Sequence, residues 1–572
     1  MSIKNVLKIS VLIIIFVFTA ENDAQVNRET RAVWIATNFR LDWPPPTFNA
    51  DEQKSAILEI LNNLKRNNFN TIYFQIRSNG VVLFNSSHEP LSPHLTGIIN
   101  GDPGYDPLTF IIEESHKRGM EIHAWANMAR CFSGSETEIF NDTNHISKKK
   151  PEWIVRVNGN GSPAYWLDPG LPEVKNYLAS LLEEVVINYD IDGIHLDFLR
   201  YPDKDFKDDT SFKMYGNGKD RDDWRRENIT SILQEIFYRT KAIKPWVKVG
   251  IAPFGIYKNI KGAVGTQGFS DVYQDRDEWL RREIVDYIAP QIYWPFDSNP
   301  DFGELAKDWV ENGKGKNIIL GIAPYKPEVY SQLKRVISFS REVNASGIAF
   351  FRYGNIKNYD FSLFREKSYP SPMPWIDKNL PPAPINLLVT LNKNNFYRIS
   401  LSWEMPEIDK TFTKPVYFAL YNFPTKNFAF NSENLFEVIQ AKSPKLSMAI
   451  TRPRYVNYYF GLKSIDKLWN ESEESSNIVH VKIDELSELS ELNRHKSDPV
   501  LFKNTDNSLH IILFENREDQ ISILGVGDFI SSQLGLMNVG KGYNIIEIEP
   551  NDFESITIDY ANSGKKKTLK IN

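Results

Sequence analysis

The sequence predicts an α/β protein built on a (β/α)8 TIM-type barrel that is followed by two small all-β domains. Eight short apolar runs recur between residues 30 and 355, helical-looking segments separate most of them, and short alternating strands follow residue 369. Strands that alternate with helices favour a parallel sheet, and eight of them suggest a closed barrel. A doubly wound open sheet is the alternative, but no glycine-rich phosphate turn follows the first run.

The eight apolar runs are the expected barrel strands. In chain order they read TRAVWIATN, TIYFQIR, EIHAWANMAR, GIHLDFLRY, KVGIAPFG, YIAPQIYW, IILGIAP and GIAFFRY. Residues 51–68 carry Ile57, Leu61 and Leu64 at helical spacing, and residues 172–189 begin with a proline, as helices often do. Both segments are therefore expected to be helices of the outer ring.

Length and composition describe a folded protein of several domains. The chain has 572 residues, of which 41% are hydrophobic and 24% charged. Its formal net charge of -6 offers no basic field for a phosphate backbone, so a nucleic-acid partner is not expected.

The N-terminus has the pattern of a secretory signal peptide over residues 1–24. Lys4 and Lys8 precede an apolar run, and small and polar residues follow it. Because the run is much shorter than the ~20 residues that span a bilayer, we expect cleavage and no membrane span afterwards. The only cysteine, Cys131, lies far from this segment. The mature protein is thus expected to be secreted, periplasmic or at the cell surface, without a lipoprotein anchor or an internal disulfide.

Domain boundaries follow from changes in sequence pattern. The barrel is expected over residues 25–370 and a proline-rich linker over 371–380, with few contacts crossing it. Residues 381–485, with RISLSWEMP and SIDKLWNES, resemble a fibronectin type III module. Residues 498–572 predict a small β domain, whose ending resembles the C-terminal sorting domains of type IX secretion cargo.

Polar side chains recur on one face of four predicted strands. The active site of such a barrel lies where the strands end, and side chains two apart on a strand share a face. These polar residues are Tyr73, Gln75 and Arg77 in the second run, His123 and Asn127 in the third, His195 and Asp197 in the fourth, and Gln291 and Tyr293 in the sixth. Their convergence predicts a site at this end of the barrel.

Each of these residues also has a purely structural interpretation. His123 and His195 can be core histidines bonded to their neighbours, and Arg77 can simply neutralise Asp197. The histidines form no compact motif such as HExxH, so neither a catalytic metal nor another cofactor is expected.

Eight motifs in order give the first domain a specific resemblance. They are RAVWIATNFRLDWP, TIYFQIRSNG, PGYDPL, HKRGMEIHAWANMAR, WLDPGLPEV, DGIHLDFLRYP, WRREN and APQIYW. Together they resemble the glycosyl hydrolase-like family 10 proteins. The resemblance implies a (β/α)8 glycosidase barrel and cleavage of bacterial cell-wall (peptidoglycan) glycan, particularly of strands stripped of peptides.

The resemblance also implies roles for single residues. It makes Asp197 the catalytic acid of the fourth strand and places Gln75, Arg77, Asn127 and Gln291 at the sugar site. Phe198 departs from the Tyr or Asp that often follows the acid in this family. Leu199 stands where chitinase-type enzymes carry their catalytic Glu, so their mechanism does not transfer.

Glycoside hydrolysis usually needs a second carboxyl, as nucleophile or as base for water. Asp42 in LDWP and Asp168 in WLDPG are equally good candidates. Aromatic rings at strand ends can stack on sugars, and Trp43 and Trp294 are expected to face substrate while Trp34 is structural. The other expected substrate contacts are His123, His195, Arg200, Tyr201 and Tyr293.

Two alternative functions remain open at this stage. The enzyme could hydrolyse another environmental or host polysaccharide. The barrel could also bind glycan without catalysis, because a fold does not fix a function and a second acid is not evident.

Overall fold

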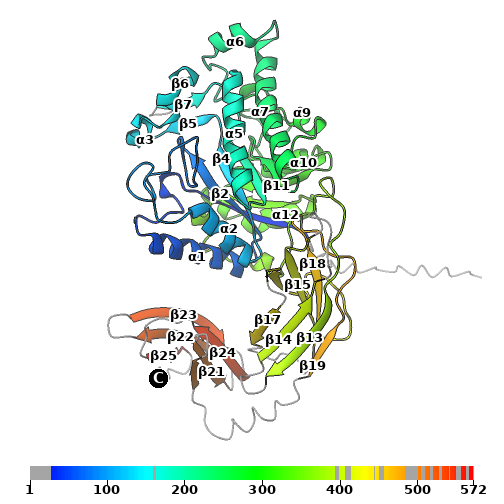
Figure 1. The fold of residues 1–572 in the computed structure, drawn as a ribbon. Helices are drawn as coiled ribbons and strands as arrows, with labels where there is room; N and C mark the ends of the chain where they lie inside the picture. Colours follow the sequence, from blue (N-terminus) through cyan, green and yellow to red (C-terminus); the bar gives the residue numbers. More distant parts are fainter. Residues whose placement is uncertain are drawn as a thin grey trace, which may run out of the picture.

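The computed structural model describes most of the chain from Arg28 onward (Figure 1). The described residues are 28–158, 163–392, 398–405, 414–442, 445–449, 457–482, 500–503, 509–515, 519–526, 531–539, 542–548, 555–561 and 566–570. The predicted signal peptide over residues 1–24 lies outside them.

Eight parallel strands form a closed barrel, as the sequence predicts. The first strand, β1 (Thr30–Ile35), pairs in parallel with both β2 and β12, which closes the ring. Around the ring the order is β1, β2, β4, β8, β9, β10, β11, β12. Their bounds are β2 (Thr71–Ser78), β4 (Glu121–Asn127), β8 (Gly193–Asp197), β9 (Lys248–Ile251), β10 (Tyr287–Ile288), β11 (Asn317–Ile322) and β12 (Gly347–Phe350).

Helices follow the strands and surround the barrel (Figure 1). Both predicted outer helices form, as α1 (Ala50–Arg66) and α5 (Pro172–Asn188). The Asn49 side chain caps α1 by accepting from two backbone N–H groups of its first turn. The other long helices are α2 (Pro107–Lys117), α7 (Arg221–Ile243), α10 (Phe302–Glu311) and α12 (Leu333–Glu342). The short ones are α3 (Thr137–Asn141), α4 (Ile146–Lys149), α6 (Asp209–Tyr215), α8 (Gly268–Asp271), α9 (Arg276–Arg281) and α11 (Pro327–Tyr330).

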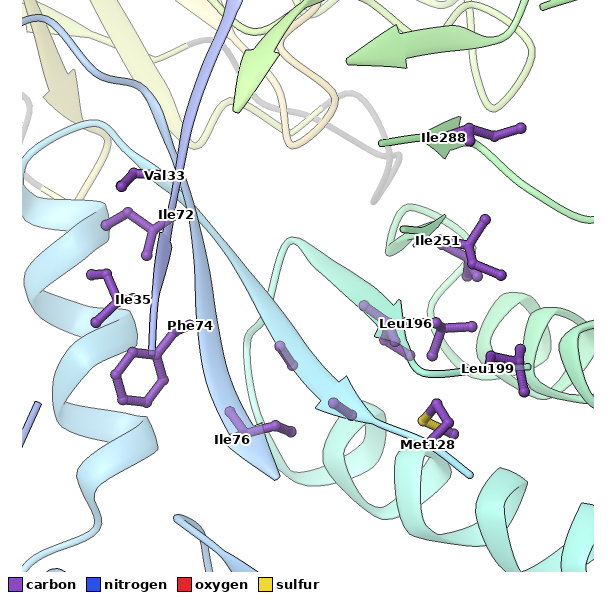
Figure 2. Close-up of a cluster of buried hydrophobic side chains, with 14 of the residues drawn as sticks. Val33, Ile35, Ile72, Phe74, Ile76, Met128, Leu196, Leu199, Ile251 and Ile288 are labelled. Atoms are coloured by element: carbon purple, nitrogen blue, oxygen red, sulfur yellow. The ribbon is translucent and has the colours of Figure 1, made fainter. Parts of the chain in front are cut away.

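Alternation along each strand separates two cores. On β2, Ile72, Phe74 and Ile76 point outward and pack in the apolar layer beneath the helices (Figure 2). Tyr73 instead belongs to a smaller cluster inside the barrel. Burying one large apolar side chain stabilises the fold by about 1.5–3 kcal/mol, so the outer layer holds the barrel together. In the described ranges, no helix is long and apolar enough to cross a membrane.

An insertion after β4 is absent from the sequence prediction. Strands β5 (Arg130–Ser133), β6 (Ile154–Asn158) and β7 (Pro163–Leu167) form a small antiparallel sheet with β7 in the middle. The backbone N–H of Leu167 donates to the carbonyl of Ala129 at 2.8 Å, which ties this sheet to the end of β4. A two-residue strand, β3 (Val81–Val82), pairs antiparallel with the end of β2.

The second domain is a two-sheet sandwich. One sheet contains β13 (Ile385–Asn392), β14 (Arg398–Glu404) and β17 (Lys445–Ala449). The other contains β16 (Leu435–Gln440), β15 (Tyr417–Phe423), β18 (Asn457–Ile465) and β19 (Val479–Lys482), in that order. Trp403 is buried between the sheets, with its ring centroid 5.1 Å from that of Phe418. The fibronectin type III resemblance stays a prediction.

The C-terminal region holds two further antiparallel sheets. One has the order β20 (Val500–Lys503), β21 (Leu509–Glu515), β24 (Gly542–Ile548), and the other β23 (Ser531–Val539), β22 (Asp519–Val526), β25 (Ser555–Tyr560), β26 (Lys566–Lys570). This confirms an all-β region after the barrel, while its sorting role stays a prediction.

Contacts between the barrel and the sandwich correct one expectation. Lys65 at the end of α1 pairs with Glu437 at 2.5 Å, and the hydroxyls of Tyr369 and Tyr421 lie 2.9 Å apart. The Arg28 guanidinium also donates to the carbonyl of Trp469 at 2.5 Å. The prediction that few contacts cross the linker over residues 371–380 is therefore wrong, because β15 and β18 pack beneath the barrel (Figure 1).

Candidate active site

Asp197 ends β8, where the chain leaves the barrel. The carbonyl of Asp197 accepts from the N–H of Met128 at 2.8 Å, and that of Phe198 accepts from the N–H of Ala129 at 3.1 Å. Phe198 has a φ of 52°, a left-handed conformation that is uncommon for a bulky residue. The backbone after β4 therefore fixes the position from which the Asp197 side chain projects.

The Asp197 carboxyl has one anchored oxygen and one free oxygen. Its Oδ1 accepts from the N–H of Phe198 at 2.8 Å and from Gln291 Nε2 at 3.2 Å. Its Oδ2 accepts no hydrogen bond from any described residue, and the residue is 6% exposed. Burial raises the pKa of this carboxyl, while Arg200 and Arg130 oppose the rise. A carboxyl with a raised pKa and a free oxygen suits proton donation.

Asp42 lies on the opposite side of the barrel mouth. Its Oδ1 accepts from Arg352 Nη1 at 2.5 Å and from the N–H of Gly354 at 2.7 Å, and its Oδ2 accepts from the N–H of Ala36 at 2.8 Å. Arg352 follows β12, which is four strands from β8 in either direction round the ring. Burial raises the pKa of Asp42. With both oxygens held, this carboxylate links two loops, and its catalytic role stays a prediction.

Asp168 also has both carboxylate oxygens bonded. Its Oδ1 accepts from the N–H of Gly170 at 2.9 Å and its Oδ2 from the hydroxyl of Ser211 at 2.6 Å. Burial raises its pKa, and the nearby charge of Asp208 acts in the same direction. Asp168 thus joins the start of α5 to α6, and its role as the second carboxyl likewise stays a prediction.

Arg77 does not pair with Asp197, which corrects the structural alternative for both residues. The buried Arg77 guanidinium instead makes a two-point ion pair with Glu89, with N–O distances of 2.8 and 2.5 Å. It also donates to the carbonyls of Asn127 and Met128. Arg77 therefore positions the end of β4, beside Asp197, and is buried. Its place as a sugar contact stays a prediction.

His123 and His195 are core residues, and the expectation of substrate contacts is wrong for both. Trp34 Nε1 donates to His195 Nε2 at 2.9 Å, and His195 Nδ1 lies 3.0 Å from the Tyr287 hydroxyl. That hydroxyl lies 2.7 Å from His123 Nδ1, and His123 Nε2 lies 3.4 Å from Glu121. We call these five residues the inner polar chain. It lies inside the barrel, and every ring nitrogen in it has a partner.

The direction of each bond in the inner polar chain follows from its first donor. An indole N–H can only donate, so His195 Nε2 carries no proton and its Nδ1–H donates to Tyr287. Tyr287 then donates to His123, whose Nε2–H faces Glu121. Burial holds the pKa of His195 well below its usual value, as this neutral form requires.

Trp43 and Tyr201 are buried, which contradicts the expectation that they contact substrate. The Trp43 indole is 0% exposed, donates to the carbonyl of Gln53 at 2.9 Å and packs on Phe74. The Tyr201 hydroxyl accepts from Asn228 at 3.0 Å, and its ring is 0% exposed. Both rings strengthen the layer between strands and helices.

Other expected residues do reach the mouth. Gln291 contacts Asp197 directly. Burial raises the pKa of the Tyr293 phenol, and the nearby charge of Asp197 acts in the same direction. Trp294 is partly exposed beside Lys326. Asn127 is nearly buried at the end of β4, and its Oδ1 has no hydrogen-bond partner in the described part of the chain.

Gln75 has a different task from the one expected. Its Oε1 accepts from the N–H groups of Thr37 at 3.0 Å and Asn38 at 2.9 Å, which fastens the loop after β1. Its place as a sugar contact stays a prediction.

Arg200, an expected substrate contact, lies at the mouth together with Arg130 and Phe351, which the sequence did not single out as site residues. Arg130 and Arg200 flank Asp197, and their guanidinium carbons lie 3.6 and 4.7 Å from the ring centre of Phe198. Arg130 was overlooked as a site residue because it ends a predicted strand, whereas in the structure it begins β5. On another side of the mouth, Phe351 lies 5.9 Å from Tyr293 between ring centres.

Comparison with known proteins places the chain in a family. A model of the family described as glycosyl hydrolase-like 10 matches residues 29–334, which is more than half of the chain. The chain belongs to this family. It is therefore a glycoside hydrolase.

Relatives of this family member match over different lengths. "Glycosyl hydrolase YngK" of Bacillus subtilis is 31% identical over 494 residues, covering 79% of this chain and 94% of that protein. "Glycosyl hydrolase DigH" of Escherichia coli K12 is 35% identical over 331 residues, covering 53% of this chain and 74% of that protein. The PgaB glycoside hydrolase domain from Bordetella bronchiseptica covers 60% of this chain at 13% identity, with a TM-score of 0.45.

Proposed function

We propose that this glycoside hydrolase cleaves the glycan of the bacterial cell wall, acting on strands from which the peptides have been removed, with Asp197 as the general acid. The observation that carries the proposal is the Asp197 carboxyl, which has a free oxygen at the mouth of a barrel of this family. The choice of wall glycan rests on the resemblance of the eight sequence motifs to family 10 proteins.

The chemistry proposed for Asp197 balances without a cofactor. The protonated Oδ2 donates its proton to the glycosidic oxygen while the bond from that oxygen to the anomeric carbon breaks. Water then adds to the anomeric carbon and returns a proton to the carboxylate. Gln291 and the N–H of Phe198 hold Oδ1, so the donating oxygen keeps one orientation during the reaction.

Aromatic rings at the mouth supply apolar surface for sugar faces. Tyr293, Phe351 and Tyr325 form a connected wall, with ring centres 5.9 to 6.3 Å apart. Tyr325 is 50% exposed, so it is open to a ligand. Stacking on such rings is a common way for glycosidases to hold a chain across the scissile bond.

The experiment that tests the proposal compares three substrates with the full mature chain. Peptide-free wall strands, intact wall fragments and N-acetylglucosamine oligomers are incubated separately, and the products are analysed by mass spectrometry. We expect turnover of the peptide-free strands with one water added per bond broken. Anhydro ends would indicate a lytic transglycosylase, and binding without turnover would indicate a non-catalytic barrel. Cleavage of another polysaccharide alone would replace the proposed substrate.

We also propose export through residues 1–24. The support is the order of Lys4, Lys8 and a short apolar run in that segment. Mass spectrometry of the N-terminus after expression in a secreting host should show cleavage near Ala24, and an intact N-terminus on cytosolic protein would contradict export.

A further inference from the structure

Two arginines at the mouth differ from the other buried arginines of the barrel. Arg31, Arg77 and Arg225 each pair with a carboxylate, namely Glu29, Glu89 and Asp208, at 2.5 to 2.7 Å. Neither the Arg130 nor the Arg200 guanidinium has a hydrogen bond or ion pair with any described residue, although both lie close enough to Asp197 to oppose the rise that burial causes in the pKa of its carboxyl. Asp197 is a nearby anion for both partly buried guanidinium groups, but neither forms an ion pair with a carboxylate of the described residues.

The surroundings of Arg130 and Arg200 hold their charged groups without neutralising them. The guanidinium carbon of Arg200 lies 4.7, 4.6 and 5.7 Å from the ring centres of Phe198, Phe254 and Trp166. That of Arg130 lies 3.6 Å from the ring centre of Phe198. Aromatic rings stabilise the cations only in part.

The Arg130 guanidinium has a buried donor without a partner among the described residues. Arg130 Nε is buried and has no hydrogen-bond acceptor in the described part of the chain. A guanidinium has five N–H donors in a planar fork, which matches the two oxygens of a carboxylate. Leaving such donors unpaired in a buried place is unfavourable, so the pair is built for an anion that comes with the ligand.

We propose that Arg130 and Arg200 bind a carboxylate on the sugar next to the scissile bond, namely the free lactyl carboxylate of a muramic residue. This rests on the proposed function. In intact wall glycan that carboxyl is joined to the peptide as a neutral amide, whereas removal of the peptide leaves a carboxylate. The arginine pair therefore makes the enzyme selective for strands without peptides.

The first test compares two chemical forms of the substrate with the native enzyme. Peptide-free strands are divided in two, and in one half the lactyl carboxylates are converted to primary amides. This removes the charge and hardly changes the size. We expect the native enzyme to cleave the carboxylate form with a kcat/KM about 10- to 100-fold higher, as expected for the loss of a charge-assisted hydrogen-bonded pair. Equal kcat/KM on both forms overturns the proposal.

Variants then assign the selectivity to the two arginines. Arg130→Met with Arg200→Met should lower the ratio of kcat/KM between carboxylate and amide strands to about 1, whereas Arg130→Lys with Arg200→Lys should keep part of it, because charge remains without the fork. Equal losses on both strand forms would overturn the proposal and place the arginines' effect on Asp197. If the double variant does not fold by circular dichroism, Arg200→Met alone is measured.

A matched control is Arg226→Met. Arg226 also stacks on an aromatic ring, with its guanidinium carbon 4.3 Å from the ring centre of Phe269, but it pairs with Asp223. We expect Arg226→Met to keep the native ratio, and loss of the ratio in this variant would overturn the assignment.

If the native enzyme cleaves neither strand form but does cleave another glycan, the proposed function fails and the lactyl assignment fails with it. Cleavage of peptide-free strands without charge selectivity refutes the arginine pair alone.

Discussion

His195 and Asp197 lie two residues apart on β8 and face the same interior, yet their surroundings differ in kind. His195 belongs to the inner polar chain, where donors and acceptors match from Trp34 to Glu121. Asp197 lies at the mouth, where its Oδ2 and the nearby Arg130 Nε have no hydrogen-bond partner among the described residues. Buried polar groups whose hydrogen bonds are all made stabilise the fold, whereas polar groups without a partner at the barrel mouth are free to bind a ligand.

The first prediction concerns the buried ion pair of Arg77 and Glu89 near Asp197, and it has the largest expected effect on stability. Arg77→Met leaves the Glu89 carboxylate buried without its cation, which should lower the free energy of unfolding by about 3–5 kcal/mol. Urea unfolding measures the change. The double variant Arg77→Met with Glu89→Leu should be less destabilised, since no lone charge remains. A single variant as stable as the native protein would contradict the positioning role.

The second prediction tests the inner polar chain. Tyr287→Phe removes the hydroxyl that joins His195 to His123 and should cost about 1–3 kcal/mol of stability, because two buried ring nitrogens lose their partner. Activity per folded molecule should change little. As a control, Tyr238→Phe on α7 alters a ring that is 55% exposed and should be neutral. A Tyr287→Phe variant that is stable but inactive would show that the inner polar chain takes part in catalysis.

The third prediction concerns the anchor of the catalytic carboxyl. Gln291→Leu removes the 3.2 Å hydrogen bond to Asp197 Oδ1, and kcat/KM should fall by about 3- to 10-fold, the worth of one ordinary hydrogen bond. Because this bond lowers the pKa of Asp197, its loss should also move the alkaline limb of the pH–rate profile to higher pH. A limb that stays in place or moves to lower pH would show that Gln291 does not act on Asp197.

The smallest expected effect is a pH dependence of stability. Burial raises the pKa of Asp197 in the folded protein above its ordinary value of 3.8. Below pH 3.8 the carboxyl is protonated in both the folded and the unfolded protein. As the pH rises from there through the pKa of the folded protein, the native protein loses stability. Asp197→Asn lacks this loss, so its stability relative to the native protein should grow from acid to neutral pH. Unfolding at several pH values measures the difference, and the opposite trend would contradict the raised pKa.

The fold could be read from the sequence more fully than the site. Period-two alternation in TIYFQIR and the spacing of apolar runs depend on local chain geometry, so they predict strands and ring order. The partner of a polar side chain depends on residues far away in the sequence. Nothing local to Arg77 indicates Glu89, which comes from the segment after β3, and nothing local to His195 indicates Tyr287.

At the barrel mouth, too, the sequence indicates where a strand ends but not where each side chain points. Asp197 was identified correctly as lying at the strand end, but Trp43, at an equally plausible strand end, turns inward to bond the carbonyl of Gln53. The antiparallel sheet of β5, β6 and β7 carries Arg130 and Trp166 to the site, and its short strands resemble loops in sequence.

Turnover of peptide-free wall strands by Asp197→Asn tests the central claim most directly. Asparagine keeps the shape and the anchoring contacts of Oδ1, but its amide has no acidic proton to transfer to the glycosidic oxygen. The account predicts a folded protein whose kcat/KM is at least ~100-fold below that of the native enzyme. Unfolding in urea confirms that the variant is folded before turnover is measured. A folded Asp197→Asn that cleaves these strands at nearly the native rate would contradict the account and leave Asp42 and Asp168 as the acids to test.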